Sequence, residues 1–177
     1  MSVIYIETER LILRAWNASD RVVFAEMNAN EEVMRYFPRC LTAAESHAFV
    51  DRIEAELSAN GYGLFAVELK STGDFIGYVG FHQFTFDSPF APGWEIGWRI
   101  SDRYWHRGYA TEAASACMEH ARVNKLFDKV YSFTAVPNGA SERVMKRIGM
   151  DYVGRFNHPA LPTGHWLEEH VLYQHVF

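Results

Sequence analysis

The hydrophobic pattern changes its period around Gly108, and this change constrains the fold more than any other feature of the sequence. Residues 94–100 carry the aromatic and β-branched side chains that are typical of a strand. Beyond Gly108 the apolar residues recur at intervals of three and four, which is the spacing of one helix face. They are Ala114, Cys117, Met118 and Ala121. A strand therefore leads into a helix across a short loop, as in α/β proteins.

Several other segments predict strands. Residues 62–69 and 75–84 are rich in aromatic and β-branched side chains and flank the turn-like residues 70–74, so they predict a hairpin. The remaining strand predictions cover residues 10–14, 128–136, about 150–156 and about 167–176. Together these strands predict a mixed, largely antiparallel sheet.

Capping residues mark the predicted helices. Thr42 and Glu45 form a capping box ahead of an apolar stripe that ends near Gly61. Asn138 can cap another helix, with Gly149 just beyond its end. Two further helices are predicted, one capped near residues 19–20 and one over residues 31–36. We expect one α/β (α+β) domain over residues 1–177.

The charge balance and the cysteines exclude several classes of protein. The chain has 17 Lys plus Arg against 22 Asp plus Glu, a net charge of −5, which disfavours nucleic-acid binding driven by overall positive charge. No apolar run approaches the ~18–20 residues that a membrane span needs. Cys40 and Cys117 form no CxxC pair, and we see no signal peptide. We therefore expect a cytoplasmic protein that binds neither nucleic acid nor membrane.

Histidines 158, 165, 170 and 175 crowd the end of the chain. His170 and His175 are five residues apart and would face opposite sides of a strand. We therefore expect no metal site among them.

Residues 100–112 hold the segment with the strongest chemical signal. A helix N-terminus offers unpaired N–H groups and a positive dipole, and Gly108 and Ala110 lack the bulk that would keep phosphates from the backbone. Arg103 and Arg107 add local positive charge. The pattern predicts a pyrophosphate cradle. The alternative is that Gly108 only permits a tight turn and the arginines lie in solvent.

This loop resembles the acyl-CoA pyrophosphate loop of the GNAT superfamily of N-acetyltransferases, whose pattern is Gln/Arg-x-x-Gly-x-Gly/Ala. Gly108 and Ala110 occupy the two small positions, whereas Trp105 stands at the leading Gln/Arg position. The flanking sequences, Glu95-Ile-Gly-Trp98 and Thr111-Glu112, are similar to those of the RimJ/RimL-like branch, which includes ribosomal-protein N-terminal acetyltransferases.

A second motif strengthens the resemblance. Asn138-Gly-Ala-Ser141 opens a predicted helix that ends in Lys146-Arg-Ile-Gly-Met150, similar to the Asn-x-x-Ser pattern of the same branch. The two motifs and the order of elements agree over roughly residues 8–176. The resemblance implies the GNAT acyl-CoA N-acyltransferase fold, with a mixed, mostly antiparallel sheet of six to seven strands and about four helices.

The resemblance also implies that acetyl-CoA is the acyl donor. In the family, a bulge splays the strand near residues 95–100 from the strand near residues 131–136, and the pantetheine arm lies in the gap as a pseudo-strand. The residues implied in binding acetyl-CoA are Ile100, Ser101, Arg103, Trp105, His106, Arg107, Gly108, Tyr109, Ala110, Thr111, Asn138 and Ser141.

Acetyl transfer to an amine needs a base, because free amines are mostly protonated at neutral pH. Glu95 is the first candidate, since alternation along a strand places it on the same face as Gly97 and Arg99. The alternative is a surface carboxylate or an ion-pair partner of Arg99. Glu168 and Glu169 are weaker candidates, of which at most one can face a cleft.

The departing thiolate needs a proton donor. Many members of the superfamily place a Tyr seven residues after the capping Asn, but here that residue is Met145, which cannot donate a proton. The resemblance therefore favours Ser141 as general acid or thiol hydrogen-bond partner. The alternative is that Ser141 only ties the start of the helix through backbone hydrogen bonds.

The acceptor amine is left open between a protein N-terminus and a small amine such as a polyamine, an amino acid or a drug. The loops at residues 84–94 and 158–166 should set this choice, since loops carry specificity on a shared scaffold. A non-catalytic acyl-CoA-binding module is the other class of function, favoured by Trp105 and Met145. An exposed final strand would be compatible with a homodimer.

Overall fold

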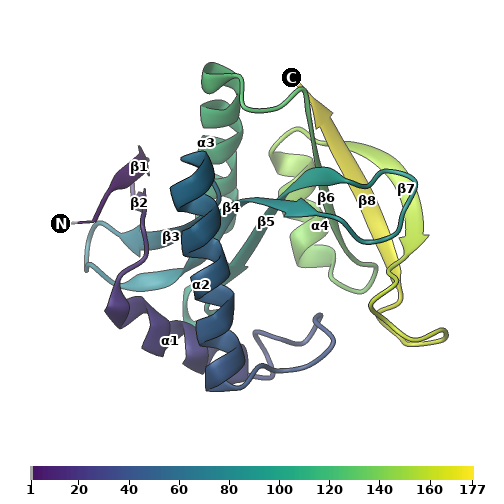
Figure 1. Ribbon diagram of the computed structural model, residues 1–177, viewed down its shortest axis with the longest axis horizontal. Helices are drawn as coiled ribbons and strands as arrows, with labels where there is room; N and C mark the ends of the chain where they lie inside the picture. Colours follow the sequence, from purple (N-terminus) through teal and green to yellow (C-terminus); the bar gives the residue numbers. More distant parts are fainter. Residues whose placement is uncertain (1) are drawn as a thin grey trace.

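The structure is a computed structural model that describes residues 2–177, over which the chain forms one eight-stranded sheet and four α-helices (Figure 1). The strands lie in the order β1-β2-β3-β4-β5-β6-β8-β7. β5 and β6 are parallel, and the other neighbouring strands are antiparallel. The strands are β1 (Ile4–Glu7), β2 (Leu11–Arg14), β3 (Leu64–Leu69), β4 (Phe75–Phe84), β5 (Gly93–Ile100), β6 (Lys129–Ala135), β7 (Asp151–Asn157) and β8 (Glu169–Val176). The helices are α1 (Ala18–Ala29), α2 (Ala43–Asn60), α3 (Tyr109–Asn124) and α4 (Gly139–Arg147), with a 3₁₀ turn over Asp102–Tyr104.

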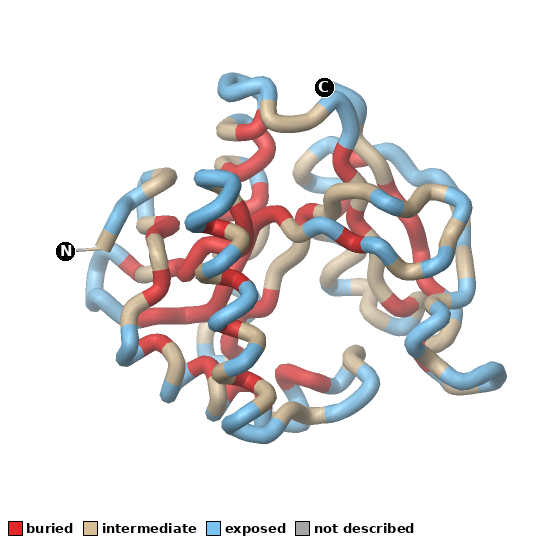
Figure 2. Tube along the Cα trace, viewed as in Figure 1, coloured by how far each residue is buried: buried red, intermediate tan, exposed pale blue. Residues whose placement is uncertain are grey.

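Helices cover both faces of the sheet. α1 and α2 pack on the face that carries Tyr78, whose ring contacts Phe24 of α1 and Phe49 of α2. Phe65 lies next to the residue that pairs with Tyr78, so it points to the opposite face, where it packs against His120 of α3. Figure 2 shows the buried positions gathered in the central strands and along α3, with exposed positions on the outer turns. The core therefore lies on both sides of β2–β5.

The predicted fold class is confirmed, and most predicted elements are present. The capping box of α2 forms as expected, with the Thr42 hydroxyl accepting from the amide of Glu45, and Gly61 ends the helix in the left-handed region. Asn138 caps α4. The predicted hairpin is β3–β4. The sheet has one strand more than expected because β1, a short and largely exposed edge strand, carries no strong apolar alternation.

The prediction of a helix over residues 31–36 is wrong. This segment forms successive turns instead. The side chain of Asn30 accepts hydrogen bonds from the amides of Glu32 and Val33. These amides therefore do not donate to backbone carbonyls of α1, and the helix does not continue. Pro38 then prevents extension toward α2.

Two expectations about the sheet are also corrected. β5 pairs with β4 from Gly93 to Ile100 without a register shift, so no bulge separates β5 from β6. Their separation begins instead after Glu95, which pairs with Tyr131. The final strand is not an edge that could pair with a second subunit, because β8 lies between β6 and β7.

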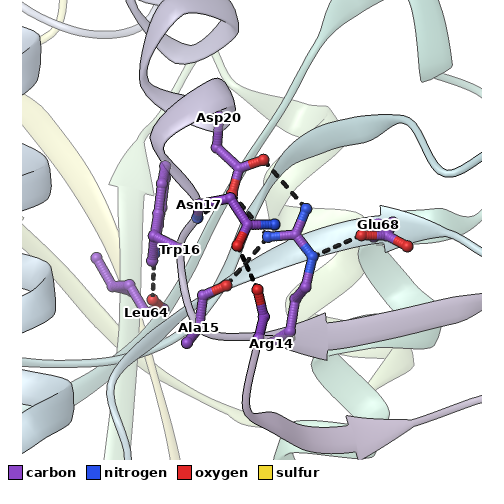
Figure 3. A network of polar contacts seen from close by, with 8 residues as sticks. Arg14, Ala15, Trp16, Asn17, Asp20, Leu64 and Glu68 are labelled. Atoms are coloured by element: carbon purple, nitrogen blue, oxygen red, sulfur yellow. Dashed lines mark hydrogen bonds and ion pairs between the residues drawn. The ribbon is translucent and has the colours of Figure 1, made fainter.

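An ion-pair network joins α1 to the sheet (Figure 3). The guanidinium of Arg14, on β2, contacts the Asp20 carboxylate of α1 at 2.6 Å and the Glu68 carboxylate of β3 at 2.6 Å. Asp20 also accepts from the amide of Asn17, which is the N-cap of α1, so the helix begins before the predicted cap. Arg14 and Asp20 are 5% and 2% exposed, so each charge depends on the other for compensation.

Replacing Asp20→Ala should therefore lower the free energy of unfolding by about 3–5 kcal/mol, because it leaves the Arg14 charge buried with less compensation and removes a helix cap. Urea unfolding at pH 7 measures this loss. The control is Asp51→Ala, which breaks an ion pair between Asp51 and Arg21 on the surface and should cost less than about 1 kcal/mol. Equal losses in the two variants would contradict the role of the network.

Candidate functional site

A cavity of about 740 Å³ lies where β5 and β6 separate. Just beyond the single paired position, the hydroxyl of Ser132 on β6 donates to the carbonyl of Ile96 on β5 at 2.9 Å. This side-chain bond satisfies a carbonyl that would otherwise lack a strand partner. The cavity is lined from both faces of the sheet, by the segment at residues 32–38 beside α1 and by the starts of α3 and α4.

The start of α3 presents a row of free backbone amides to this cavity. No amide from residue 106 to residue 111 donates to another group within residues 2–177. Gly108 is the N-cap with a φ of 80°, and His106 has a φ of 60°. A Cβ at Gly108 would have room, its nearest neighbour being the end of the Arg10 side chain at 3.6 Å, so the left-handed backbone is the reason for glycine here. The row is suited to an anion.

Hydrogen bonds and an ion pair hold this loop in place. The indole of Trp105 donates to the carbonyl of Ile100 at 2.8 Å, closing the loop on the end of β5. At the first turn of α3, the carboxylate of Glu112 accepts from the Thr8 hydroxyl at 2.6 Å and pairs with Arg10 at 2.6 Å. The amides are therefore fixed in position before any ligand binds.

The structure brings most of the predicted donor-binding residues to the cavity wall. These are Ile100, Trp105, His106, Gly108, Tyr109, Ala110, Thr111, Asn138 and Ser141. Ser101, Arg103 and Arg107 lie outside the wall. The guanidinium of Arg107 lies 5.9 Å from the ring centroid of Tyr104 instead.

Two groups of wall residues were not predicted from the sequence. Arg143 and Arg147 of α4 line the cavity and add positive charge that Arg103 and Arg107 were expected to supply. Their spacing of four on a helix capped by Asn138 is the signal that could have found them. The rings of His158 and His170 also line the cavity, with centroids 5.0 Å apart, and burial lowers the pKa of His170 to about 4.

The start of α4 arranges the hydroxyl of Ser141 as a hydrogen-bond donor. Its oxygen accepts from the indole of Trp98 at 3.3 Å and from the amide nitrogen of Asn138 at 3.0 Å. The Asn138 amide has this orientation because its oxygen accepts from the backbone of Ser141, while its nitrogen also donates to Thr134. With two donors on the oxygen, the Ser141 proton is left to donate into the cavity.

Glu95 reaches the cavity from the opposite face of the sheet. It shares the face of Arg99, which pairs with Tyr78, whereas Trp98 points toward α4. Burial raises the pKa of Glu95 to about 8. Within residues 2–177 its carboxyl group forms neither an ion pair nor a hydrogen bond, so the alternative of an Arg99–Glu95 pair is wrong.

The other predicted candidates lie elsewhere. Glu168 accepts from the amide of Gly164 in a turn, and Glu169 pairs with Arg155 at 2.8 Å, so neither lines the cavity. Met145 is buried at the cavity wall, where it offers no proton. The aromatic residues Tyr36 and Phe37 also line the cavity. Phe84, Phe86, Phe90 and Trp94, from the loop predicted to set specificity, pack into aromatic clusters instead.

Residues 10–151 match the family model described as an acetyltransferase (GNAT) domain. The chain belongs to this family. The resemblance inferred from the motifs around Gly108 and Asn138 is thereby confirmed, and the protein is an N-acetyltransferase by family.

Similar proteins agree with this assignment. YnaD of Bacillus subtilis (strain 168), named an uncharacterized N-acetyltransferase, is 29% identical over 168 residues that cover 94% of each chain. A GNAT-family acetyltransferase structure from Bacillus anthracis has a TM-score of 0.80 at 26% identity, covering 99% of this chain and 98% of that one. RimL, named a ribosomal L7/L12 alpha-N-protein acetyltransferase and solved with coenzyme A, has a TM-score of 0.79 at 16% identity, with coverage of 99% and 98%. At that identity the likeness to RimL concerns the fold alone.

Two features are absent from the described residues, a membrane-spanning helix and a cluster of metal-ligating side chains. None of the helices within residues 2–177 combines the length and the apolar character needed to cross a bilayer. The same residues bring together no group of three or more His, Cys, Asp or Glu side chains that could hold a metal ion.

The raised pKa of Glu95 predicts a pH-dependent stability. A carboxyl group whose pKa is higher in the folded state stabilises the fold fully below its unfolded pKa of about 4.5, and this contribution is lost as the pH rises toward 8. Relative to wild type, Glu95→Gln should therefore gain more than about 1.4 kcal/mol, the value of one pKa unit, between pH 4.5 and pH 8. Urea unfolding across this range measures the gain.

Glu31→Gln, at an exposed position, removes the same formal charge and serves as the control. A constant difference between wild type and Glu95→Gln from pH 4.5 to pH 8 would contradict the raised pKa.

Proposed function

We propose that this protein transfers the acetyl group of acetyl-CoA to a primary amine by direct attack in a ternary complex. The observation that carries the proposal is the cavity between β5 and β6. On one face of the sheet it is lined by the free amides of residues 106–111 and the hydroxyl of Ser141. On the other face it is lined by Glu95, whose carboxyl group has a raised pKa. Two substrates can therefore approach from opposite faces and meet between the strands.

The face of α3 and α4 suits the acyl donor. The free amides of residues 106–111 would hold the pyrophosphate, with Arg143 and Arg147 adding positive charge. Beyond Ile96, the edge of β5 that faces β6 has no strand partner and can bond an extended pantetheine arm. When bound, acetyl-CoA supplies an activated thioester carbonyl.

Glu95 acts on the amine, and Ser141 acts on the departing sulfur. With a pKa of about 8, the Glu95 carboxyl group is partly ionised at neutral pH and basic enough to take a proton from an ammonium group, directly or through water. The amine nitrogen then bonds to the acetyl carbon as the carbon–sulfur bond breaks, and the proton that this nitrogen loses passes to the departing sulfur, which leaves as CoA thiol. The Ser141 hydroxyl donates a hydrogen bond to the departing sulfur.

The acceptor is a primary amine, either a protein N-terminus or a small amine. RimL shares the fold and is named a ribosomal L7/L12 alpha-N-protein acetyltransferase, which favours an N-terminal α-amine. The wall residues Tyr36 and Phe37 on one loop and His158 on another are positioned to contact the acceptor. We expect cytoplasmic substrates.

Release of CoA thiol from acetyl-CoA tests the function. The acceptor panel contains peptides with Ser, Ala or Met N-termini, polyamines, amino acids and aminoglycosides. We expect turnover with at least one class, which also identifies the acceptor. Acetyl-CoA binding by calorimetry without turnover on any amine would indicate a non-catalytic acyl-CoA-binding module and refute the proposal.

Ser141→Ala should lower kcat by about 10–100-fold, because it removes one hydrogen bond to a developing negative charge. The dissociation constant for acetyl-CoA should change less than about threefold. Ser58→Ala, an exposed serine on α2, is the matched control and should retain full activity. Unchanged kcat in Ser141→Ala would remove this residue from the mechanism.

A further inference from the structure

Arg99 is a buried cation without a buried counterion. Its side chain lies on the face of β5 proposed to meet the acceptor, and it lines the cavity. The residue is only 8% exposed. The guanidinium lies 4.2 Å from the ring centroid of Phe37 and 5.4 Å from that of Tyr78. In the part of the chain that the structure describes, its one hydrogen bond runs from Nη1 to the side-chain oxygen of Asn28, at 2.6 Å. Within residues 2–177 no carboxylate forms an ion pair with it.

Arg14 shows how the same chain treats a buried guanidinium that has only a structural role. That residue is 5% exposed, and two carboxylates, Asp20 and Glu68, contact it at 2.6 Å. Arg99 is almost as buried, yet it has the neutral side chain of Asn28 in place of an acid. A buried guanidinium cannot discharge itself by losing a proton, so its charge remains uncompensated.

One nitrogen of Arg99 is left for a ligand. Nε is enclosed and has no hydrogen-bond partner, and Nη1 is used by Asn28. Nη2 also has no partner within residues 2–177 but is not enclosed, so it is the nitrogen that meets the cavity. Between Arg99 and Glu95, Gly97 leaves the strand surface bare, and a Cβ there would meet nothing within 4 Å. One face of β5 therefore presents, in order, the carboxyl group of Glu95, the uncovered backbone of Gly97 and the cation of Arg99.

We infer that the acceptor is an amine that also carries a carboxylate, and that Arg99 is the specificity-determining residue that binds it. This inference rests on the proposed function. With the amine at Glu95, the carboxylate reaches Nη2 and supplies the missing counterion. Four residues of strand separate the Cα atoms of Glu95 and Arg99 by ~13 Å, so amine and carboxylate are separated by a chain about two to three residues long.

A carboxylate suits this position better than a larger anion. A single free nitrogen between the rings of Phe37 and Tyr78 can pair with a small planar group, whereas a tetrahedral anion calls for more donors. The carboxylate can be the C-terminus of a short peptide-like acid or an acidic side chain near a protein N-terminus. The chemistry at Arg99 is the same in both cases.

The test compares three acceptors of matched length: Ala-Ala-Ala as the free acid, the same tripeptide as the C-terminal amide, and Ala-Ala-Asp as the C-terminal amide. Calorimetry in the presence of CoA measures Kd, and CoA release from acetyl-CoA measures kcat/KM. We expect wild type to prefer at least one of the two acids over the neutral amide by about 10–100-fold, as charge-assisted hydrogen bonds allow. Preference for the free acid identifies a small substrate, and preference for the Asp peptide identifies a protein N-terminus.

Two variants remove the free charge in different ways. Arg99→Met deletes it, with Arg122→Met on the surface of α3 as control. Asn28→Asp keeps Arg99 in place and gives it an internal counterion. The Asn28 amide nitrogen now donates to the Ser46 hydroxyl, and the new carboxylate can accept from that hydroxyl instead; Asn60→Asp is the control. In both site variants the preference for an acid should fall below about threefold, and in both controls it should persist.

Equal affinity of wild type for the acids and the neutral amide, or no binding of either acid, would overturn the inference. An acid preference that survives in a folded Asn28→Asp protein would do the same. Failure of the proposed function gives a different result: the acid preference in Kd remains while no amine releases CoA.

Discussion

The separation of two parallel strands is the constraint on which the candidate site depends. β5 and β6 pair at Glu95 and Tyr131 and then diverge. The bond from Ser132 to the Ile96 carbonyl makes this divergence tolerable, because it satisfies a buried acceptor without a neighbouring strand. Each strand is held on its other side by a long antiparallel pairing, with β4 and with β8. The sheet can therefore open in the middle while both halves stay rigid.

The alternation of side chains along β5 then places the two halves of the proposed chemistry on opposite faces. Trp98 points toward α4 and donates to the hydroxyl of Ser141, whereas Glu95 and Arg99 point to the face of Tyr78, which α1 and α2 cover. A base and a proton donor on the same face would hydrogen-bond to each other, and neither would then be available to the substrates. Placed on opposite faces of an open sheet, they can meet only through the reacting groups between them.

Local features of this site could be predicted from the sequence, and features set by tertiary packing could not. The caps at Thr42 and Asn138 depend on residues three positions apart, so their patterns are visible in the sequence. Residues 31–36 have a helical pattern but form turns, because the side chain of Asn30 accepts from the amide of Glu32. Helix propensities do not predict this bond. The pKa of Glu95 and the approach of Arg143 to the cavity depend on which elements pack together, and a single sequence does not specify this.

The contrast between Arg14 and Arg99 indicates what the proposed carboxylate site costs the fold. Two acids compensate Arg14 inside the protein, so its charge contributes to the junction of α1 with the sheet. Arg99 has only the amide of Asn28 and surrounding aromatic rings, which stabilise a guanidinium less than a carboxylate does. The free protein therefore carries an electrostatic penalty that a carboxylate-bearing acceptor can relieve. An internal acid at residue 28 would remove that penalty, and with it the driving force for selecting such an acceptor.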